Sequence, residues 1–202
     1  MNALNRGGAA ALLVGLLAAC ASPSPAPVLL TLPPAAAPAA AAAPSPGASA
    51  PLLAVRRVNL PEYLVARRVR YRAEASTLAE WPNTFWAERI EIGVSREFVA
   101  ALRQQLPGWA LCDSACGDQM PTLGLQVDLV PLDYLRDAKK LQARARITVT
   151  GAGASPRTLQ TQAVAYELPA SADTPQAQAQ AMAALIQQVA ASAAQLVRAA
   201  KP

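Results

Sequence analysis

Apolar and polar residues alternate most regularly in two neighbouring segments of the chain, 123–129 and 141–150. Leucine and valine occupy every second position of the first segment, and the second continues the same period of two. In a β-strand this period places the apolar side chains on one face and the polar ones on the other. The polar stretch 133–140 between the segments supplies a turn. We therefore predict an antiparallel hairpin with one buried and one solvent-exposed face.

Weaker strand patterns occur elsewhere in the chain. They predict strands at 55–60, 67–77, 109–112 and 157–167. The segment 67–77 places Arg68, Arg70 and Arg72 on one face, about 7 Å apart. Residues 83–88 are expected to connect this strand to a helix.

Apolar residues recur at helical spacing in two further segments. The first predicted helix covers 90–106 and ends at Pro107-Gly108. The second begins at Thr174-Pro175, with proline in its first position, and continues to about Ala200. Glutamines interrupt its apolar stripe, so we do not expect it to span a membrane.

The predicted order of elements is strand, strand, helix, four strands, helix. This order indicates an α+β fold, a two-layer sandwich in which a mainly antiparallel sheet carries two helices packed on one face. The opposite face of the sheet is then available to water or to a partner. The arginines predicted to point outward from it are Arg68, Arg70, Arg72, Arg144 and Arg146.

The first 19 residues have the features of a secretory signal. A charged start at Arg6 precedes an apolar run of about nine residues, far too short to span a bilayer. The run ends in Leu17-Ala18-Ala19-Cys20, which resembles a bacterial lipobox. The resemblance implies that residues 1–19 are removed and that Cys20 carries fatty-acyl chains such as palmitate. Ala21 then implies sorting to the outer membrane. The alternative is an ordinary signal peptide with an incidental cysteine.

Residues 20–51 are predicted to form the lipidated cysteine and a disordered tether. Nine of the 31 residues from Ala21 to Pro51 are proline, and most others are alanine or serine. Such a composition cannot bury enough apolar surface to fold. The tether would span about 95 Å when extended and about 30 Å as a flexible coil. We therefore expect a folded domain at 52–202 that works some distance from its anchor.

The chain contains no histidine. This absence excludes Ser-His-Asp and Cys-His catalysis and imidazole-ligated metals, and no nucleotide-binding fingerprint occurs. We expect a protein that is not an enzyme and uses no cofactor or metal. The net charge is +5, and loss of Arg6 leaves 17 basic against 13 acidic side chains. Because no dense Lys/Arg cluster is present, we expect no binding of nucleic acid.

Two cysteines remain once Cys20 is lipidated, Cys112 and Cys116. Outside the cytoplasm a pair this close favours a disulfide across a short loop. The loop of about five residues would stabilise the fold by only about 2 kcal/mol. Functional thiols and free thiols are the alternatives.

Several of these positions together resemble a known family. Leu60-Pro61-Glu62-Tyr63-Leu64 precedes the arginine-bearing strand, and Trp86-Ala87-Glu88 leads into the first helix. With the lipobox upstream, this combination resembles the PqiC type of ABC-transport auxiliary lipoprotein, over about residues 52–200. The sequence departs from the family pattern at Ala66 and Arg67, which replace Arg and Pro, and at Arg89, which replaces a proline.

The resemblance implies a non-catalytic component of an MCE-type lipid transport system. Such a lipoprotein would dock the transport conduit at the outer membrane, with its domain facing the periplasm, and would support envelope integrity. Its partners would be an MCE-domain protein, the other transporter subunits and the membrane itself through the lipid anchor. A homo-oligomeric ring would be consistent with the family. The rival interpretation is an outer-membrane lipoprotein that activates a peptidoglycan synthase.

The candidate partner-binding residues follow from the motifs. They are Arg68, Arg70, Arg72, Tyr63 and Trp86. Each has a structural alternative. The arginines form a solvated strand face, Tyr63 packs a sheet edge, and Trp86 is a core residue.

Overall fold

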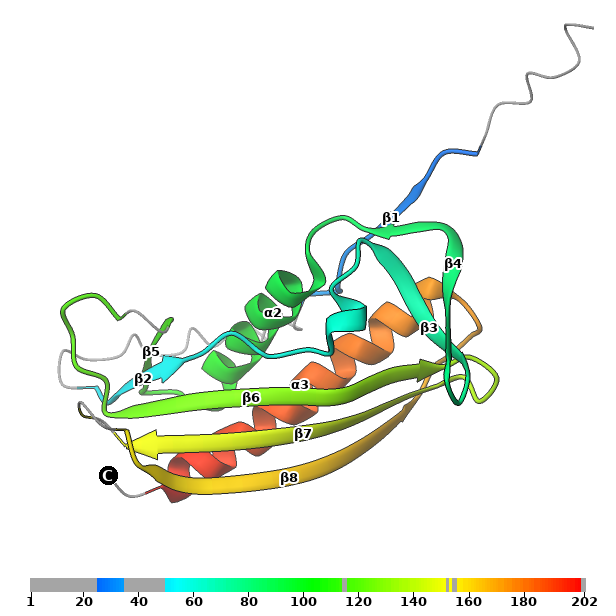
Figure 1. Cartoon of the computed structure of the whole chain (residues 1–202). Coiled ribbons are helices and arrows are strands. Elements are labelled where there is room, and N and C mark those ends of the chain that lie inside the picture. Colours follow the sequence, from blue (N-terminus) through cyan, green and yellow to red (C-terminus); the bar gives the residue numbers. More distant parts are fainter. Residues whose placement is uncertain (1–24, 35–49, 114–115, 152, 154–155, 201–202) are drawn as a thin grey trace, which may run out of the picture.

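The computed structural model describes residues 25–34, 50–113, 116–151, 153 and 156–200. The predicted signal at 1–19 and the predicted lipidation site Cys20 lie outside them. In the described chain, an eight-stranded sheet carries two helices on one face (Figure 1). The predicted α+β two-layer sandwich is confirmed.

Four strands precede the first helix and four follow it. The bounds are β1 Val28–Leu30, β2 Leu52–Val55, the 3-10 turn η2 Glu62–Leu64, β3 Arg68–Glu74, β4 Thr77–Trp86, α2 Ile90–Gln105, β5 Ala110–Asp113, β6 Leu123–Leu135, β7 Lys140–Gly151, β8 Thr158–Pro169 and α3 Pro175–Ala199.

Strands β6 and β7 form the predicted antiparallel hairpin, paired from Leu123↔Gly151 to Leu135↔Lys140. Strand β8 continues the sheet antiparallel to β7. The alternate apolar residues of β6 and β7 are buried, as their period of two predicts. Both strands are longer than predicted, because β6 continues to Leu135, into the polar stretch assigned to the turn, and β7 begins at Lys140 and ends at Gly151.

Both helices match their predicted ranges closely. Helix α2 ends at Gln105, before Pro107-Gly108, and packs against α3. At the start of α3, the Thr174 hydroxyl accepts a hydrogen bond from the Ala177 amide at 3.2 Å, and Pro175 follows in the first turn. Alanines on its buried face let α3 lie close to the hairpin. Neither helix is sufficiently long and apolar for a membrane span, and the described residues contain no other candidate.

Strand β4 was missed by the sequence analysis, which assigned 83–88 to a connection. It pairs antiparallel with β3, but the register shifts between Arg68 and Arg70. Asn83 lies in this bulge with a positive φ of 49°. A bulge interrupts the period of two, so the buried side chains are unevenly spaced. They are Trp81, Thr84 and Trp86.

Strand β1 lies within the segment predicted to be a tether. It pairs in parallel with β4, and both Leu30 and Leu32 join the hydrophobic core. Burial of each leucine is worth on the order of 1.5–3 kcal/mol. The prediction that all of 20–51 lacks folded structure is therefore wrong for residues 28–32. These five residues contain no proline and four large apolar side chains, which distinguishes them from the rest of the segment.

Strand β2 occupies 52–55 instead of the predicted 55–60. It pairs in parallel with β5 on one side and with the start of β6 on the other. Beyond it, Asn59 makes one isolated bridge to Asp128. The sheet is therefore mixed. Its long ladders are antiparallel, as predicted, and the short strands β1, β2 and β5 add parallel pairs.

Candidate functional site

The L-P-x-Y-L motif forms the turn η2 directly before β3 and brings Tyr63 against β6. The Tyr63 hydroxyl donates a hydrogen bond to Asp133 Oδ1 at 3.0 Å, and Arg72 Nη2 donates to the same oxygen at 2.9 Å. The Arg72 guanidinium also lies 5.6 Å from the centre of the Tyr63 ring. The side chains of Arg72 and Asp133 are only 19% and 14% exposed. Residues from η2, β3 and β6 thus meet at one carboxylate.

This carboxylate contributes to the pKa shifts of its two neighbours. The hydrogen bond to Asp133 raises the pKa of Arg72. Burial, followed by the hydrogen bond and the charge of Asp133, raises the pKa of the Tyr63 phenol. Both shifts favour the states in which the two groups donate hydrogen bonds, the protonated phenol and the charged guanidinium. Arg72 Nε is buried without a hydrogen-bond partner among the described residues.

The other two arginines of β3 share a single acidic partner. Arg68 Nε lies 3.3 Å and Arg70 Nε 3.2 Å from the two oxygens of Glu80 on β4. Arg70 Nη1 also donates to the Tyr63 carbonyl at 2.9 Å, and Arg68 lies 4.9 Å from the centre of the Phe85 ring. One carboxylate therefore balances two positive charges. The predicted arginine stripe is held in place by contacts within the domain and keeps a net positive charge.

An aromatic cluster next to these arginines was missed by the sequence analysis. Trp81 Nε1 donates to Gln178 Oε1 at 2.7 Å, and Gln178 Nε2 donates to the Arg70 carbonyl at 2.8 Å. Arg136 lies 4.4 Å from the centre of the Trp81 ring and 4.9 Å from that of Tyr71. These contacts tie the start of α3 to β3 and β4. Trp81 and Gln178 are 97 positions apart, so no local sequence pattern could have paired them.

The W-A-E motif lies beside a cleft of about 440 Å³. Trp86 forms part of its wall but is only 4% exposed, which agrees with its alternative role as a core residue. Its backbone amide donates to the Arg67 carbonyl at 2.7 Å, joining β4 to the start of β3. The exposed side chains of Arg67 and Arg89 also line the cleft.

The acidic residues at this cleft have basic neighbours. Glu88 accepts a hydrogen bond from Arg96 at 2.6 Å, which lowers the pKa of the Glu88 carboxyl. The buried Glu91 carboxylate makes an ion pair with Arg89, although it accepts no hydrogen bond of good geometry from the described residues. These pairs leave the cleft with both charge signs along its wall.

Two further arginines lie on the uncovered face of the sheet, as predicted. Arg144 and Arg146 are exposed on β7 and line a hollow of about 440 Å³ with Asp128 and Val130. The arginines of β3 contact the turn η2 and Glu80. Arg144 and Arg146 line a different hollow. The five predicted outward arginines therefore belong to two separate groups.

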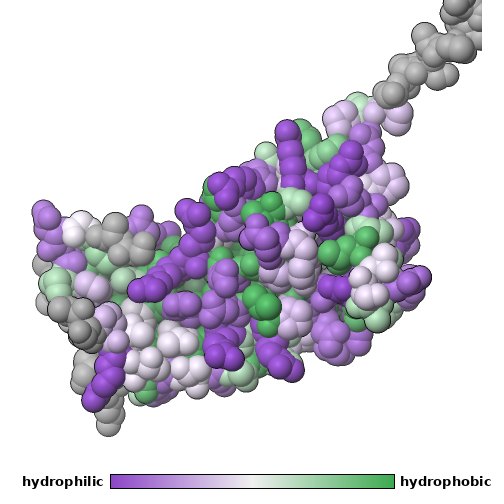
Figure 2. All heavy atoms as spheres, in the orientation of Figure 1, coloured by the Kyte–Doolittle hydropathy of each residue, from purple (hydrophilic) through white to green (hydrophobic). Residues whose placement is uncertain are grey.

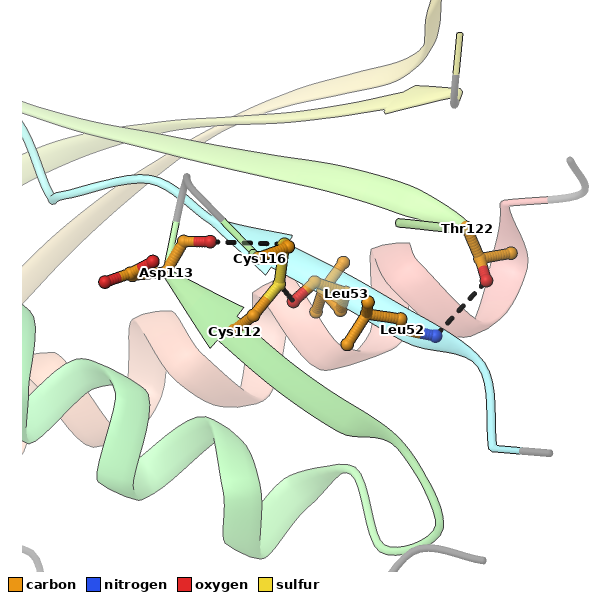
Figure 3. The surroundings of a disulfide bond; sticks show 6 residues. All are labelled: Leu52, Leu53, Cys112, Asp113, Cys116 and Thr122. Carbon is orange, nitrogen blue, oxygen red and sulfur yellow. Dashed lines mark hydrogen bonds between the residues drawn. A yellow bond between two sulfur atoms is a disulfide. The ribbon is translucent and has the colours of Figure 1, made fainter. Parts of the chain in front are cut away.

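Cys112 and Cys116 are joined by a disulfide at the end of β5, beside β2 (Figure 3). Their Cα atoms are 5.1 Å apart. Next to them, the Leu52 amide donates to the Thr122 hydroxyl at 3.2 Å. In the strand order β5 and β1 lie at opposite ends, so the disulfide is remote from the motif residues.

The structure brings four of the five predicted partner-binding residues together. Tyr63 contacts both Arg70 and Arg72, Arg68 is linked to Arg70 through Glu80, and Trp86 lies separately at the cleft. Sequence reasoning missed the acidic residues Glu80 and Asp133, because each lies in a segment assigned to no strand. The described residues contain no group of three or more metal-ligating side chains. The cluster offers hydrogen-bond donors, aromatic rings and net positive charge, which suit recognition of an acidic or polar partner.

A sequence model of one family, described as the ABC-type transport auxiliary lipoprotein component, matches residues 30–194. The match begins in β1 and ends in α3, and it includes both motifs. The chain belongs to this family. The resemblance drawn from the two motifs is confirmed.

Two curated relatives match a shorter part of the chain. They are the intermembrane transport lipoproteins PqiC of Escherichia coli (strain K12) and of Shigella flexneri, each 32% identical over 76 residues. The aligned part covers 38% of this chain and 41% of each relative. The family and these relatives place the chain among transport-associated lipoproteins.

Solved structures confirm the fold. A crystal structure of an uncharacterised protein superposes with a TM-score of 0.67 and 18% identity, covering 86% of this chain and 99% of its own. A crystal structure of a Xanthomonas campestris protein gives a TM-score of 0.57 at 18% identity, covering 85% and 92%. At such identities the likeness concerns the fold alone.

Proposed function

We propose that this protein is a non-catalytic, lipid-anchored subunit of an MCE/ABC-type lipid transport system. Acyl chains on Cys20 hold it at the outer membrane, and the domain in the periplasm docks the transport conduit there. The docking supports the integrity of the envelope. The family match over 30–194 carries this proposal, and the printed name of the PqiC relatives, which refers to intermembrane transport, supports it.

The motif residues supply the docking surface in this proposal. The η2–β3 cluster combines the ring of Tyr63 with three arginines whose partners hold them in fixed orientations. Side chains that are already ordered lose less conformational entropy on binding than mobile ones. An acidic patch on an MCE-domain protein complements the net positive charge of this cluster.

Photocrosslinking in intact envelopes tests the proposal without disturbing this cluster. Glu62 is exposed and adjacent to Tyr63, so a photoreactive residue there samples the proposed surface. Gln162, exposed on β8, is the matched control on another part of the sheet. After irradiation and detergent extraction, we expect an MCE-domain protein to crosslink at position 62 and not at 162.

Two results would contradict the proposal. Recovery of a penicillin-binding protein at position 62 would favour the peptidoglycan-synthase interpretation, and recovery of no transporter subunit at either position would remove the docking role. Replacing all three arginines of β3 by glutamate is a poorer test. The new carboxylates would lie against Glu80 and Asp133, so the variant would report on folding as well as on docking.

A further inference from the structure

Strand β1 fastens the beginning of the described chain to β4. The pairing is parallel, and the Ala87 amide donates to the Leu30 carbonyl at 2.8 Å. The Asn83 side-chain amide donates to the Pro25 and Ala26 carbonyls at 2.8 and 3.0 Å. The chain is thus attached to β4 from its first described residue onward.

Side-chain burial holds the same segment in place. Leu30 and Leu32 belong to the main hydrophobic core. Leu32 also packs against Gly93 in the first turn of α2. A Cβ added to Gly93 would lie 3.6 Å from the Leu32 Cδ1 methyl. The family match starts at residue 30, the last residue of β1, and therefore includes both Leu30 and Leu32.

This attachment changes the distance over which the lipid anchor can act. Cys20 and Pro25 are five positions apart in the sequence, and a fully extended chain of that length spans at most about 18 Å. The predicted tether up to Pro51 would span about 95 Å. Residues 35–49 connect two parts of the same domain, so they add no length between the anchor and the domain.

We propose that β1 is a clasp that holds the domain against the membrane carrying its own anchor, with the β1–β4 edge facing the lipid. This inference rests on lipidation of Cys20 in the proposed function. The domain is then held within about 18 Å of its lipid anchor and does not move at the end of a long tether. A conduit that delivers lipid must end close to a bilayer, and the clasp keeps the η2–β3 cluster near that position.

The surface of this edge suits contact with lipid. The exposed large apolar side chains of the described chain are Val28, Leu29, Ile92, Met120 and Val130. The first two lie on β1, and Ile92 lies in the turn of α2 that packs against Leu32. Figure 2 shows apolar atoms between strongly hydrophilic side chains at the end where β1 leaves the body of the domain. Apolar side chains at a membrane-facing edge can enter the headgroup region.

Two insertions of identical length test the clasp. The chain from Cys20 onward contains every described residue, and its Cys20 thiol can be coupled to a maleimide lipid in a supported bilayer while Cys112 and Cys116 remain oxidised. Neutron reflectometry then measures the mean height of the domain. Fifteen Gly/Ser residues inserted between Ala21 and Ser22 should raise it by about 12 Å, the increase in coil dimensions from about 5 to 20 residues.

The matched insertion between Ala41 and Ala42 should leave the height unchanged. Equal increases from both insertions would overturn the clasp and restore the long tether. A second variant, Leu30→Asp with Leu32→Asp, should release β1 and make both insertions act alike, with circular dichroism reporting whether the remaining domain stays folded. If only the insertion between Ala21 and Ser22 still raises the domain in this variant, as in the parent protein, the clasp would also be overturned.

A separate experiment tests the lipid anchor in the proposed function. Labelling of cells with a palmitate analogue reports on Cys20, with Cys20→Ser as the control. Absence of label at Cys20 would refute the anchor in the proposed function. The reflectometry uses a chemical lipid, so its result stands in either case.

Discussion

Two regions of this sheet are stabilised in different ways. The hairpin region, β6–β8 with α3, is held by apolar side chains that alternate along the strands and pack against a helix. The motif region, β3, β4 and η2, depends more on charged and aromatic side chains from distant parts of the chain. The hydrophobic effect is non-directional, whereas hydrogen-bonded ion pairs require a defined donor–acceptor geometry. In the region with the family's motifs, the side-chain orientations are therefore fixed by specific polar contacts.

The largest expected effect is a cavity in the hairpin region. Ile147 on β7 is fully buried, so Ile147→Ala should lower the free energy of unfolding by about 3–4 kcal/mol. Arg146→Ala, next to it on the exposed face, should change it by less than about 0.5 kcal/mol. Guanidinium unfolding of both variants measures the difference. Similar losses would show that the two faces of this strand are not as distinct as the burial pattern indicates.

A smaller effect is expected from the carboxylate at the centre of the motif region. Asp133→Ala removes the oxygen that accepts hydrogen bonds from Arg72 Nη2 and from the hydroxyl of Tyr63. Loss of hydrogen bonds to a charged group should lower the free energy of unfolding by about 2–3 kcal/mol. Asp128→Ala on the same strand is the matched control, with an expected loss below about 0.5 kcal/mol. If Asp133→Ala is no worse than this control, the motif region does not depend on the Asp133 cluster.

The smallest effect is a pH dependence at Tyr63. Tyr63→Phe should lower the free energy of unfolding by about 0.5–1 kcal/mol at pH 8. The folded-state pKa of Tyr63 is raised from 10.0, so the stabilisation by its hydroxyl is complete below pH 10 and is lost as the pH rises through the folded-state value. Urea unfolding of both proteins between pH 8 and 11 should show the difference shrinking. In an Asp133→Ala background the difference should be small at every pH, and a pH-independent difference in the parent protein would contradict this prediction.

The comparison also explains which elements the sequence predicts. The hairpin and both helices have a regular period, and their bounds agree with the structure to within a few residues, apart from the longer β6. Strand β4 has no regular period, because the bulge at Asn83 changes the spacing of its buried residues. Strand β1 is a three-residue strand whose burial depends on contacts with β4 and α2, far along the chain.

The residues of the candidate site also divide into those that a local pattern identifies and those that only distant contacts bring in. The motifs identified Tyr63, Trp86 and the arginines of β3 as residues to consider. Their partners could not be predicted, because Asp133 is 61 positions from Arg72 and Glu80 lies in an unpredicted strand. Which arginines share a carboxylate depends on strand register, and the register includes a shift that the sequence does not reveal.

The sequence by itself determined the α+β class, both helices, the central hairpin and the family, because periodicity and short motifs are local properties of a chain. Tertiary structure alone decided that β1 belongs to the domain and that Tyr63, Arg72 and Asp133 meet at one carboxylate. These features arise from pairing between segments that are distant in sequence. Their free energy comes from burial and hydrogen bonds that exist only once the sheet has assembled.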